Sequence, residues 1–324
     1  MRVIIYGAGA IGGVTGGKLA LAGYETLFIG RAHLVKAINE NGLRVVSPVG
    51  SPVVHPEAVT GPDQITFKPD DVVFLTVKSQ DTEGALTELK KYVKDVPVFC
   101  FQNSVSNEET ASRFFSRVYG VTVRLPAVYL KDGEVIARRD PPGLFVIGRY
   151  PNGTDAVTEQ VARELRDAGF LVKVTPDVMP FKWDKLIANL ANAAGAITNA
   201  REKEIDFINK SVRDEARNIM RKAGIHWITD EEMAKEWPES AAPPRGTLDS
   251  EAQSSTWQSL ARGLDSVETE YLNGEIVRQA EKLGLKAPLN EKLLSIMKEI
   301  AASRAAPGKY PPKQLMSMLG LKYP

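Results

Sequence analysis

Two kinds of segment follow each other along the first half of the chain. Continuous apolar runs, which predict strands, occupy residues 2–6, 24–29, 71–77 and 96–101. Stretches with a helical spacing of apolar residues occupy 10–22, 34–41 and 82–93. Gly23 and Gly42 stand where the first two helices are expected to end. Strands that alternate with helices predict a parallel sheet covered by helices.

The pattern changes after residue 118. Further strands are predicted at 118–129, 134–138, 144–148 and 170–174, with one helix at 154–168 between the last two. We expect these strands to extend the same sheet. After Pro176 the strand signal disappears, and residues 178–300 predict helices interrupted by a Pro-, Ala- and Ser-rich loop at 237–246. The sequence therefore predicts an α/β domain at 1–175 and an all-α domain at 176–324.

Composition narrows the class of protein. A chain of 324 residues is too long for one ordinary core, which agrees with two domains. Its hydrophobic content of 43% and charged content of 25% are those of a globular protein. A net charge of +1 gives no general attraction to nucleic acid or to an anionic membrane. No apolar run approaches the roughly 20 residues that span a bilayer.

The remaining composition points to a cytoplasmic protein without a metal. The chain opens directly on a strand-like run, without the pattern of a signal peptide. The single cysteine, Cys100, lies in an apolar run, which favours a buried inert thiol over a nucleophile. The three histidines, His33, His55 and His226, are too isolated to form a metal site.

A glycine-rich motif joins the first predicted strand to the first helix. It consists of Gly7, Ala8, Gly9, Ala10, Ile11 and Gly12. In this context the first glycine permits a tight turn, the second lets the backbone approach a pyrophosphate, and the third allows close packing of helix on strand. The amides and the dipole at the start of the helix favour anionic phosphates. We therefore expect a dinucleotide to bind here.

The end of the second strand indicates which dinucleotide. Enzymes that use NAD usually place an acid there to hold the ribose 2′-hydroxyl, whereas this chain has Gly30 and Arg31. A guanidinium can pair bidentately with a 2′-phosphate, so the sequence predicts NADPH. The alternative is that Arg31 is an ordinary surface arginine.

Polar residues follow two further strands of the predicted sheet. Lys78 comes after the run at 71–77, and Gln102 and Asn103 come after the run at 96–101. Ligands of open parallel sheets bind beyond the carboxyl ends of the strands. We therefore expect these residues on the nicotinamide side of the crevice, the alternative being ordinary polar strand ends.

One predicted helix of the second half carries an unusual polar stripe. Lys185, Asn189 and Asn192 stand at i, i+4 and i+7, so on a single helix they share one face. A lysine and two amides on a largely apolar helix suit a site that binds a small polar molecule. The alternative is a solvated stripe.

A second polar cluster lies further along the chain. It contains Ser254 and Ser255, followed by Glu268 and the run Leu272-Asn273-Gly274. Taken alone, Glu268 has a second interpretation, because Asp265 and Glu268 have the spacing of a capping box at the start of a helix.

Taken together, these motifs resemble the ketopantoate reductase (2-dehydropantoate 2-reductase) family. The motifs are spread over nearly the whole chain, and they occur in the family's order. They are the glycine motif at 7–12, Arg31, Val77-Lys78-Ser79, Gln102-Asn103, Lys182-Trp183-Asp184-Lys185-Leu186 with Asn189, Ser254-Ser255, and Glu268 with Leu272-Asn273-Gly274.

The resemblance implies a fold and a reaction. The fold is an N-terminal Rossmann-type domain and a helical C-terminal domain, with the active site in the cleft between them. The reaction is the reduction of 2-dehydropantoate to pantoate by NADPH, a step of pantothenate and coenzyme A biosynthesis. A small 2-oxo acid is thus the expected substrate, and a homodimer is the candidate assembly.

The resemblance also assigns roles to matched positions. Lys185 corresponds to the catalytic lysine that protonates the ketone oxygen, and Glu268 to the catalytic glutamate that holds the substrate hydroxyl. Asn103, Asn189 and Ser255 correspond to substrate-binding groups, with Asn103 and Lys78 also near the nicotinamide.

The sequence departs from the family pattern around the expected pocket. Ser104 stands where the family commonly has glycine, Ser259 where it has an acid, and Ala193 where it often has a second asparagine, so that Asn192 is the nearest amide. The stretch 226–245 is also unusually rich in Trp, Pro and acidic residues. Two alternatives therefore stay open: a related reductase for a different 2-oxo acid or ketone, and a non-catalytic NADPH-binding sensor.

Overall fold

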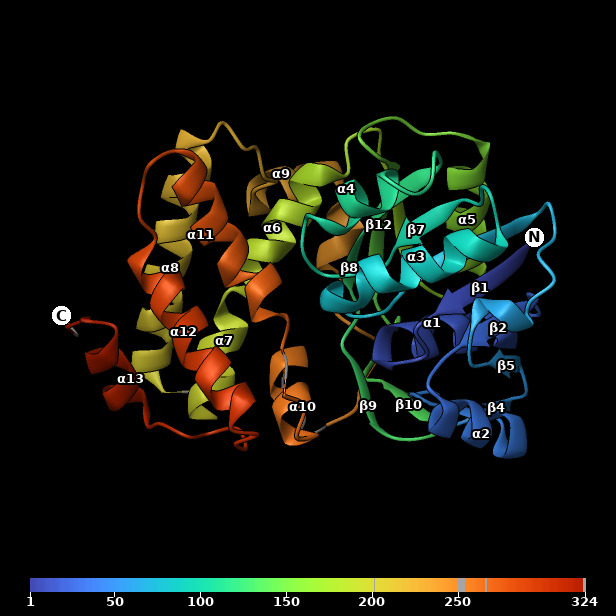
Figure 1. Ribbon diagram of the computed structural model, residues 1–324, viewed down its shortest axis with the longest axis horizontal. Coiled ribbons are helices and arrows are strands. Elements are labelled where there is room, and N and C mark those ends of the chain that lie inside the picture. The colour runs from blue at the N-terminus through green and yellow to red at the C-terminus, as the bar shows by residue number, and fades with distance from the viewer. Residues whose placement is uncertain (201, 250–253, 266, 323–324) are drawn as a thin grey trace. The chain divides into compact units, whose positions relative to one another are not determined.

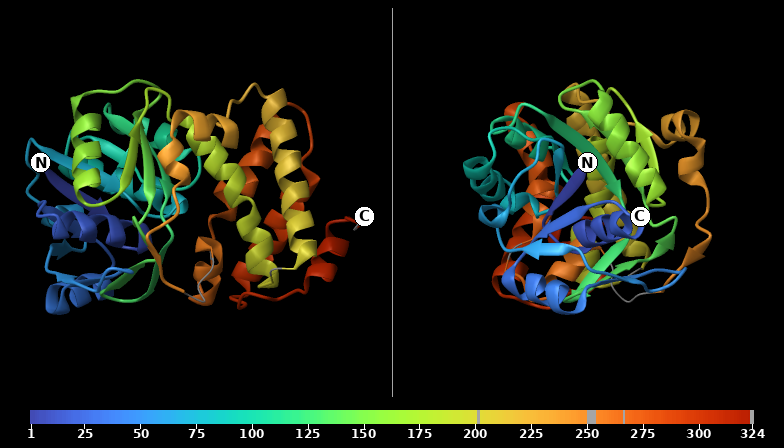
Figure 2. Two further views of the ribbon diagram at one scale, coloured as in Figure 1. Left: turned by 180° about the vertical axis from the view of Figure 1, so that it is seen from behind. Right: turned by 90° about the vertical axis from the view of Figure 1, so that its right-hand side faces the viewer.

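The computed structural model describes residues 1–200, 202–249, 254–265 and 267–322 and divides into two compact units. Unit 1 comprises residues 1–182 and 228–250, and unit 2 comprises residues 183–227 and 251–324. Figures 1 and 2 show the sheet-containing unit 1 and the helical unit 2. No helix of the described residues is long and apolar enough to cross a membrane.

The main sheet of unit 1 has eight strands in the order β13-β12-β8-β7-β6-β1-β2-β5. All neighbouring pairs are parallel except β8 with β12. The strands are β1 (Arg2–Tyr6), β2 (Thr26–Ile29), β5 (Glu57–Val59), β6 (Asp71–Leu75), β7 (Val98–Cys100), β8 (Val118–Arg124), β12 (Leu144–Arg149) and β13 (Leu171–Val174). The predicted parallel-rich sheet is therefore confirmed.

Helices cover both faces of this sheet. Side chains along a strand point alternately to opposite faces, so a continuous apolar strand buries apolar side chains on both. Val3 and Ile5 of β1 share one buried cluster with residues of α1, α2 and α5, whereas Ile4 shares the other with residues of α3 and α4. The helices are α1 (Ala10–Leu21), α2 (Ala32–Asn41), α3 (Thr82–Tyr92), α4 (Asn107–Ser112) and α5 (Ala156–Asp167). Short 3₁₀ turns occur at η1 (Pro62–Gln64) and η2 (Ser79–Asp81).

The prediction that all later strands extend the same sheet was wrong in part. β9 (Ala127–Lys131) and β10 (Glu134–Ala137) join β3 (Leu43–Val46) and β4 (Val53–Val54) in a separate four-stranded sheet. The run at 118–129, predicted as one strand, is divided at Pro126, whose missing amide hydrogen cannot contribute to a strand ladder. Only β8, β12 and β13 continue the main sheet.

The segment 228–250, which the sequence analysis placed in the helical domain, packs on unit 1 instead. Ile228 and Trp237 form a buried cluster with Val146, Val178 and Phe181, and this burial of apolar surface holds the segment there. It contains α9 (Asp230–Glu236), η3 (Pro238–Ala241) and β14 (Gly246–Thr247), which pairs with β11 (Arg139–Asp140).

Unit 2 is helical in its described residues apart from turns and loops. Its elements are α7 (Ala191–Thr198), α8 (Lys203–Lys222), α10 (Ser255–Ala261), η4 (Glu268–Tyr271), α11 (Asn273–Lys282), α12 (Pro288–Ala302) and α13 (Pro312–Met318). Helix α6 (Met179–Asn189) begins in unit 1 and ends in unit 2. The long helix α8 buries Ile205, Ile208, Val212, Ala216 and Ile219, which is the apolar stripe of an amphipathic helix.

Candidate active site

The glycine turn, residues 7–12, joins β1 to α1 as predicted. Gly7 has φ of 117°, and a Cβ atom there would lie 2.6 Å from the amide nitrogen of Val77. A Cβ atom at Gly12 would collide with the Gly7 carbonyl oxygen and lie 2.5 Å from Thr76 Oγ1. Both positions therefore require glycine, the first for the tight turn and the second for close packing of helix and strand.

Gly9 differs from the other two glycines. A Cβ atom built on it would meet nothing within 4 Å, so open space lies beside the turn at this point. Gly9 is also the N-cap of α1, where the first backbone amides of the helix lack partners within the helix. An open cradle at a positive helix end fits the pyrophosphate of a dinucleotide.

The turn lies at the point where the order of strands reverses. β1 is flanked by β2 on one side and β6 on the other, so the chain leaves β1 in one direction and later returns on the opposite side. Arg31, the N-cap of α2, is exposed just beyond the end of β2. Dinucleotide sites of open α/β sheets lie at such switch points, outside the carboxyl ends of the strands.

Hydrogen bonds connect the loops that follow β1, β6 and β7. The Thr76 hydroxyl donates to the Gly7 carbonyl oxygen over 2.7 Å, and the Gln102 side-chain amide donates to the Val77 carbonyl oxygen over 2.9 Å. The glycine turn, the segment that leads to Lys78 and the segment that leads to Asn103 are thereby held at one edge of the sheet. The side chain of Gln102, unlike that of Asn103, is buried and serves this connection.

The backbone around Asn103 is fixed by buried polar side chains. The Asn103 carbonyl oxygen accepts hydrogen bonds from Asn107 Nδ2 at 2.7 Å and from Ser79 Oγ at 3.2 Å. Asn107 in turn accepts a bond from the Thr82 hydroxyl, which also accepts from Gln102 Nε2 at 2.7 Å. Buried networks of this kind keep one backbone arrangement, because breaking any member leaves a polar group without a partner.

The backbone conformation at Ser104 shows why the family commonly has glycine at this position. Its φ is 80°, in the left-handed region that favours glycine. Its hydroxyl lies 3.2 Å from the hydroxyl of Ser106. The loop therefore has the backbone that a glycine would adopt, with a serine in place of it.

We expect Ser104→Gly to change the free energy of unfolding by no more than about 1 kcal/mol, because relief of the left-handed backbone offsets the entropy cost of glycine. Ser104→Val should destabilise by about 1–2 kcal/mol, since a β-branched residue tolerates this conformation least. Denaturant unfolding of the two variants measures the difference. Equal stability of Ser104→Val and the unmutated protein would contradict a left-handed backbone here.

In unit 2, Lys185 and Asn189 lie on α6, one turn apart. Lys185 is half-buried and Asn189 is buried. The segment expected as one helix through Asn192 is divided at Leu190 into α6 and α7, with Asn192 in α7, although Leu190 keeps helical dihedral angles (φ −58°, ψ −27°).

Glu268 is the first residue of η4 and is 5% exposed. The capping-box interpretation is not supported: the N-cap of η4 is Val267, without a side-chain capping bond, and the carboxylate of Asp265 accepts from Arg304 at 3.2 Å. After η4 and the single residue Leu272, helix α11 begins at Asn273, whose side chain contacts the end of α6. Asn273 Nδ2 lies 3.5 Å from the Leu190 carbonyl oxygen and donates to Asn290 Oδ1 at 2.9 Å.

The remaining predicted positions are placed as follows. Ser255 is the first residue of α10, which packs against α7, the helix of Asn192. Ser254 caps α10 by accepting a bond from the Trp257 amide. Ser259 is buried and donates its hydroxyl to the Ser255 carbonyl oxygen at 3.0 Å, and Ala193 is buried in unit 2. These two departures from the family pattern therefore contribute to packing within the helical unit.

Two groups that could carry chemistry lie inside unit 1. Cys100 is fully buried, as predicted, and burial raises the pKa of its thiol well above the ordinary value. The sequence analysis missed a buried ion pair between Lys182 and Glu108, whose side chains are 1% and 0% exposed. Burial raises the pKa of Glu108, while the nearby ammonium group opposes this shift.

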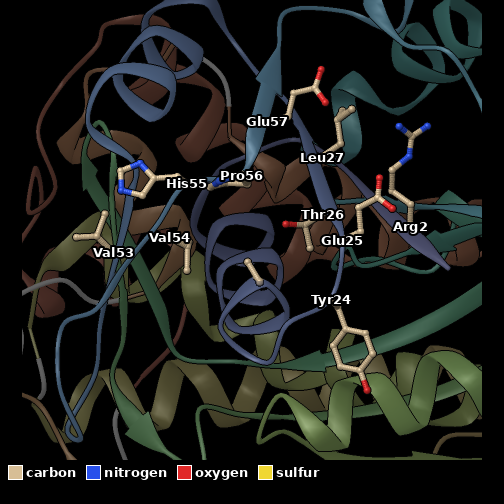
Figure 3. Close-up of a pocket in the computed structure, with 11 residues that line it drawn as sticks. Arg2, Tyr24, Glu25, Thr26, Leu27, Val53, Val54, His55, Pro56 and Glu57 are labelled. Atoms are coloured by element: carbon tan, nitrogen blue, oxygen red, sulfur yellow. The ribbon is translucent and has the colours of Figure 1, made fainter.

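A pocket of about 430 Å³ also exists in unit 1, at the opposite, amino-terminal edge of the sheet (Figure 3). Arg2, Thr26 and Glu57, the first residues of β1, β2 and β5, line it. Arg2 is paired with Asp71, and Glu25 with Lys68. Because it lies away from the glycine turn and its charged groups are largely paired, this pocket is not the candidate active site.

Comparison with known proteins agrees with the geometry. The family model "Ketopantoate reductase PanE/ApbA" matches residues 3–152, and the corresponding C-terminal model matches residues 177–301. A curated 2-dehydropantoate 2-reductase of Pyrococcus horikoshii is 32% identical over 306 residues, which cover 92% of this chain and 97% of the relative.

Solved structures show the same arrangement of elements. A ketopantoate reductase of this family from Ralstonia eutropha has a TM-score of 0.78 and 29% identity, and the match covers 94% of this chain and 99% of that one. A D-mandelate dehydrogenase solved with NADH and anilino(oxo)acetate has a TM-score of 0.80 at 21% identity over 94% of this chain and 99% of that one, a likeness of fold alone. With both family models matched in order along one chain, this protein belongs to the ketopantoate reductase family and is an oxidoreductase.

Proposed function

We propose that this protein reduces 2-dehydropantoate to pantoate with NADPH. The observation that carries the proposal is the presence in one chain of a glycine turn built for a dinucleotide and of the family's lysine and glutamate positions, Lys185 and Glu268. The relatives named 2-dehydropantoate 2-reductase match both units. This agreement favours the reaction over nucleotide binding alone.

The residues of unit 1 would hold the dinucleotide. The turn at 7–12 and the first amides of α1 would bind the pyrophosphate, Arg31 would pair with the 2′-phosphate, and Lys78 and Asn103 would lie toward the nicotinamide. When bound, NADPH supplies the hydride that reduces the ketone.

The residues of unit 2 would supply the proton and hold the substrate. As the ketone carbon accepts a hydride, negative charge develops on its oxygen, and the Lys185 ammonium would stabilise this charge and donate the proton. Glu268 would accept a hydrogen bond from the substrate hydroxyl, and Asn189, Asn192 and Ser255 would contact the remaining polar groups.

A panel of substrates tests the reaction directly. Oxidation of NADPH, followed by its absorbance, should be fastest with 2-dehydropantoate among small 2-oxo acids of different size. Faster turnover of another 2-oxo acid would assign the protein to the related-reductase alternative, which Ser104, Ser259 and Ala193 keep open. Tight NADPH binding without turnover of any ketone would assign it to the sensor alternative. A homodimer and a cytoplasmic location stay predictions, which sedimentation and cell fractionation would test.

Cofactor preference tests Arg31. NADPH should bind at least tenfold more tightly than NADH, roughly 1.4 kcal/mol, because the guanidinium pairs with the 2′-phosphate. Arg31→Ala should remove most of this difference, whereas Arg163→Ala, at an exposed arginine of α5, should leave it unchanged. Titration by fluorescence or calorimetry measures both affinities. Equal affinities in the unmutated protein would contradict the assignment of Arg31.

A further inference from the structure

The buried ion pair between Lys182 and Glu108 lies next to the backbone of the Asn103 loop. Lys182 Nζ is 2.5 Å from Glu108 Oε1, and it donates to the carbonyl oxygens of Gln102 at 3.1 Å and Val121 at 3.3 Å. The ammonium thus donates two hydrogen bonds to backbone carbonyls and pairs by charge with the carboxylate. One side chain thus connects α4, β8 and the segment that follows β7 to the first turn of α6.

Both peptide carbonyls next to Asn103 are therefore held by buried donors. The Gln102 carbonyl accepts from Lys182, and the Asn103 carbonyl accepts from Asn107 and Ser79. Ser104 then continues in the left-handed conformation. With the backbone fixed on both sides, the side chain of Asn103 starts from a defined position, which is the condition for a group that orients a substrate or a cofactor.

A purely structural role explains this pair poorly. Two buried charges are costly to desolvate, and well-packed apolar residues of similar size often stabilise a fold equally well or better. Among the described residues, neither oxygen of the Glu108 carboxylate makes an aligned hydrogen bond, so the Lys182 ammonium beside Oε1 is its compensating charge. The Lys182 ammonium binds the backbone carbonyl of Gln102, next to the proposed site residue Asn103. Holding that backbone in place is a function that would explain why the costly pair is present.

We propose that Lys182 and Glu108 form a positioning pair that fixes the backbone at Asn103 for the reaction. Glu108 holds the ammonium of Lys182, and Lys182 holds the Gln102 carbonyl. Lys182 belongs to the part of α6 that lies in unit 1, so the pair ties this loop to that end of the helix. The inference rests on the proposed function, in which Asn103 and Lys185 belong to the active site.

Unit 1 contains a matched control pair at the other edge of the same sheet. Arg2 Nε and one terminal guanidinium nitrogen donate to the two carboxylate oxygens of Asp71 at 2.8 and 2.7 Å, and the guanidinium also donates to the Thr66 carbonyl at 2.9 Å. These side chains are 8% and 0% exposed. The two pairs thus share burial and a bond to a backbone carbonyl, but only the first adjoins the proposed site.

Two double variants of the full chain separate positioning from stability: Lys182→Met with Glu108→Leu, and Arg2→Met with Asp71→Leu. Each removes both members of a pair, so no uncompensated charge stays buried. The single variant Lys182→Met should melt at a lower temperature than its double variant, because it leaves the Glu108 carboxyl alone. Melting curves thus show whether the double variant is folded before its kinetics are compared.

The first measurement is hydrogen exchange by mass spectrometry, without added cofactor. In the Lys182–Glu108 double variant, the amides of residues 103–106 should exchange about fivefold faster or more, whereas those of the glycine turn should not change. The Arg2–Asp71 double variant should leave residues 103–106 unchanged. Unchanged exchange at 103–106 in the first variant would overturn the proposal, whatever the substrate of the enzyme is.

The second measurement is steady-state kinetics. The Lys182–Glu108 double variant should lose about three- to tenfold in kcat/KM for the 2-oxo acid, while the Kd for NADPH should change less than twofold. The Arg2–Asp71 double variant should retain kcat/KM within twofold. If the Lys182–Glu108 double variant had both the melting temperature and the kcat/KM of the unmutated protein, the pair would be purely structural and the proposal would be overturned. Absence of turnover in the unmutated protein would contradict the proposed function alone, because hydrogen exchange does not depend on it.

Discussion

Lys185→Ala should lower turnover by roughly 10²–10⁴-fold, which is the usual contribution of a positioned acid–base group. The affinity for NADPH should change little, because the dinucleotide is proposed to bind to unit 1, whereas Lys185 belongs to unit 2. Single-turnover kinetics with saturating NADPH and 2-dehydropantoate would measure the effect on the chemical step. A loss in kcat as well as in kcat/KM is expected, since the proton is donated in the transition state.

Two controls make the Lys185 result specific. Lys210→Ala changes an exposed lysine of α8 that pairs with Asp214, and turnover should stay within twofold. Lys185→Arg retains the positive charge but replaces a weak acid by a group that does not deprotonate in proteins, so it should not restore turnover. Full turnover in Lys185→Ala would remove Lys185 from the site. Lys182 could not simply replace it, because its ammonium is buried in the pair with Glu108.

Glu268→Gln should lower kcat/KM for the true substrate by at least tenfold, about 1.4 kcal/mol of transition-state stabilisation. Glutamine has nearly the same shape, but its amide removes the negative charge and one acceptor oxygen that are proposed to hold the substrate hydroxyl. The melting temperature should fall by no more than a few degrees, since the substitution preserves volume. Thermal unfolding and steady-state kinetics on the same preparation measure both quantities.

Glu270→Gln is the matched control for Glu268→Gln. Glu270 belongs to the same 3₁₀ turn, but it is more exposed and pairs with Lys298 at 2.5 Å and Arg278 at 3.7 Å. Ion pairs of this exposure contribute little, so the variant should retain stability and kcat/KM. If Glu268→Gln and Glu270→Gln had the same normal kinetics, Glu268 would have no part in catalysis.

The amino-acid sequence by itself determined the nucleotide-binding half of the fold. Strands, helices and glycine turns are local features, because side-chain periodicity and the backbone freedom of glycine act over a few residues. The segment from β1 to α1 was therefore predicted almost to the residue, and the structure confirms the demands on Gly7 and Gly12. Family resemblance supplied the roles of Lys185 and Glu268, which no local pattern could give.

The tertiary structure decided how distant segments pair and which helix boundaries hold. The division of the run 118–129 at Pro126 and the separate sheet of β3, β4, β9 and β10 depend on pairing between segments far apart in the chain. The same is true of residues 228–250, whose apolar side chains pack on unit 1. At the boundary between α6 and α7, the Leu190 carbonyl oxygen contacts Asn273, which comes from another helix.

The Lys182–Glu108 pair is the clearest case of a feature that only the tertiary structure decides. From the sequence alone, both residues would be expected on the exposed surface of a helix, because charged side chains are rarely buried. The two charges come together only because α4, α6 and the end of β7 pack against one another. Their pairing then offsets the free-energy cost of removing each charge from water. Local sequence determines which elements form, whereas the contacts between elements determine which polar side chains are buried and what they hold in place.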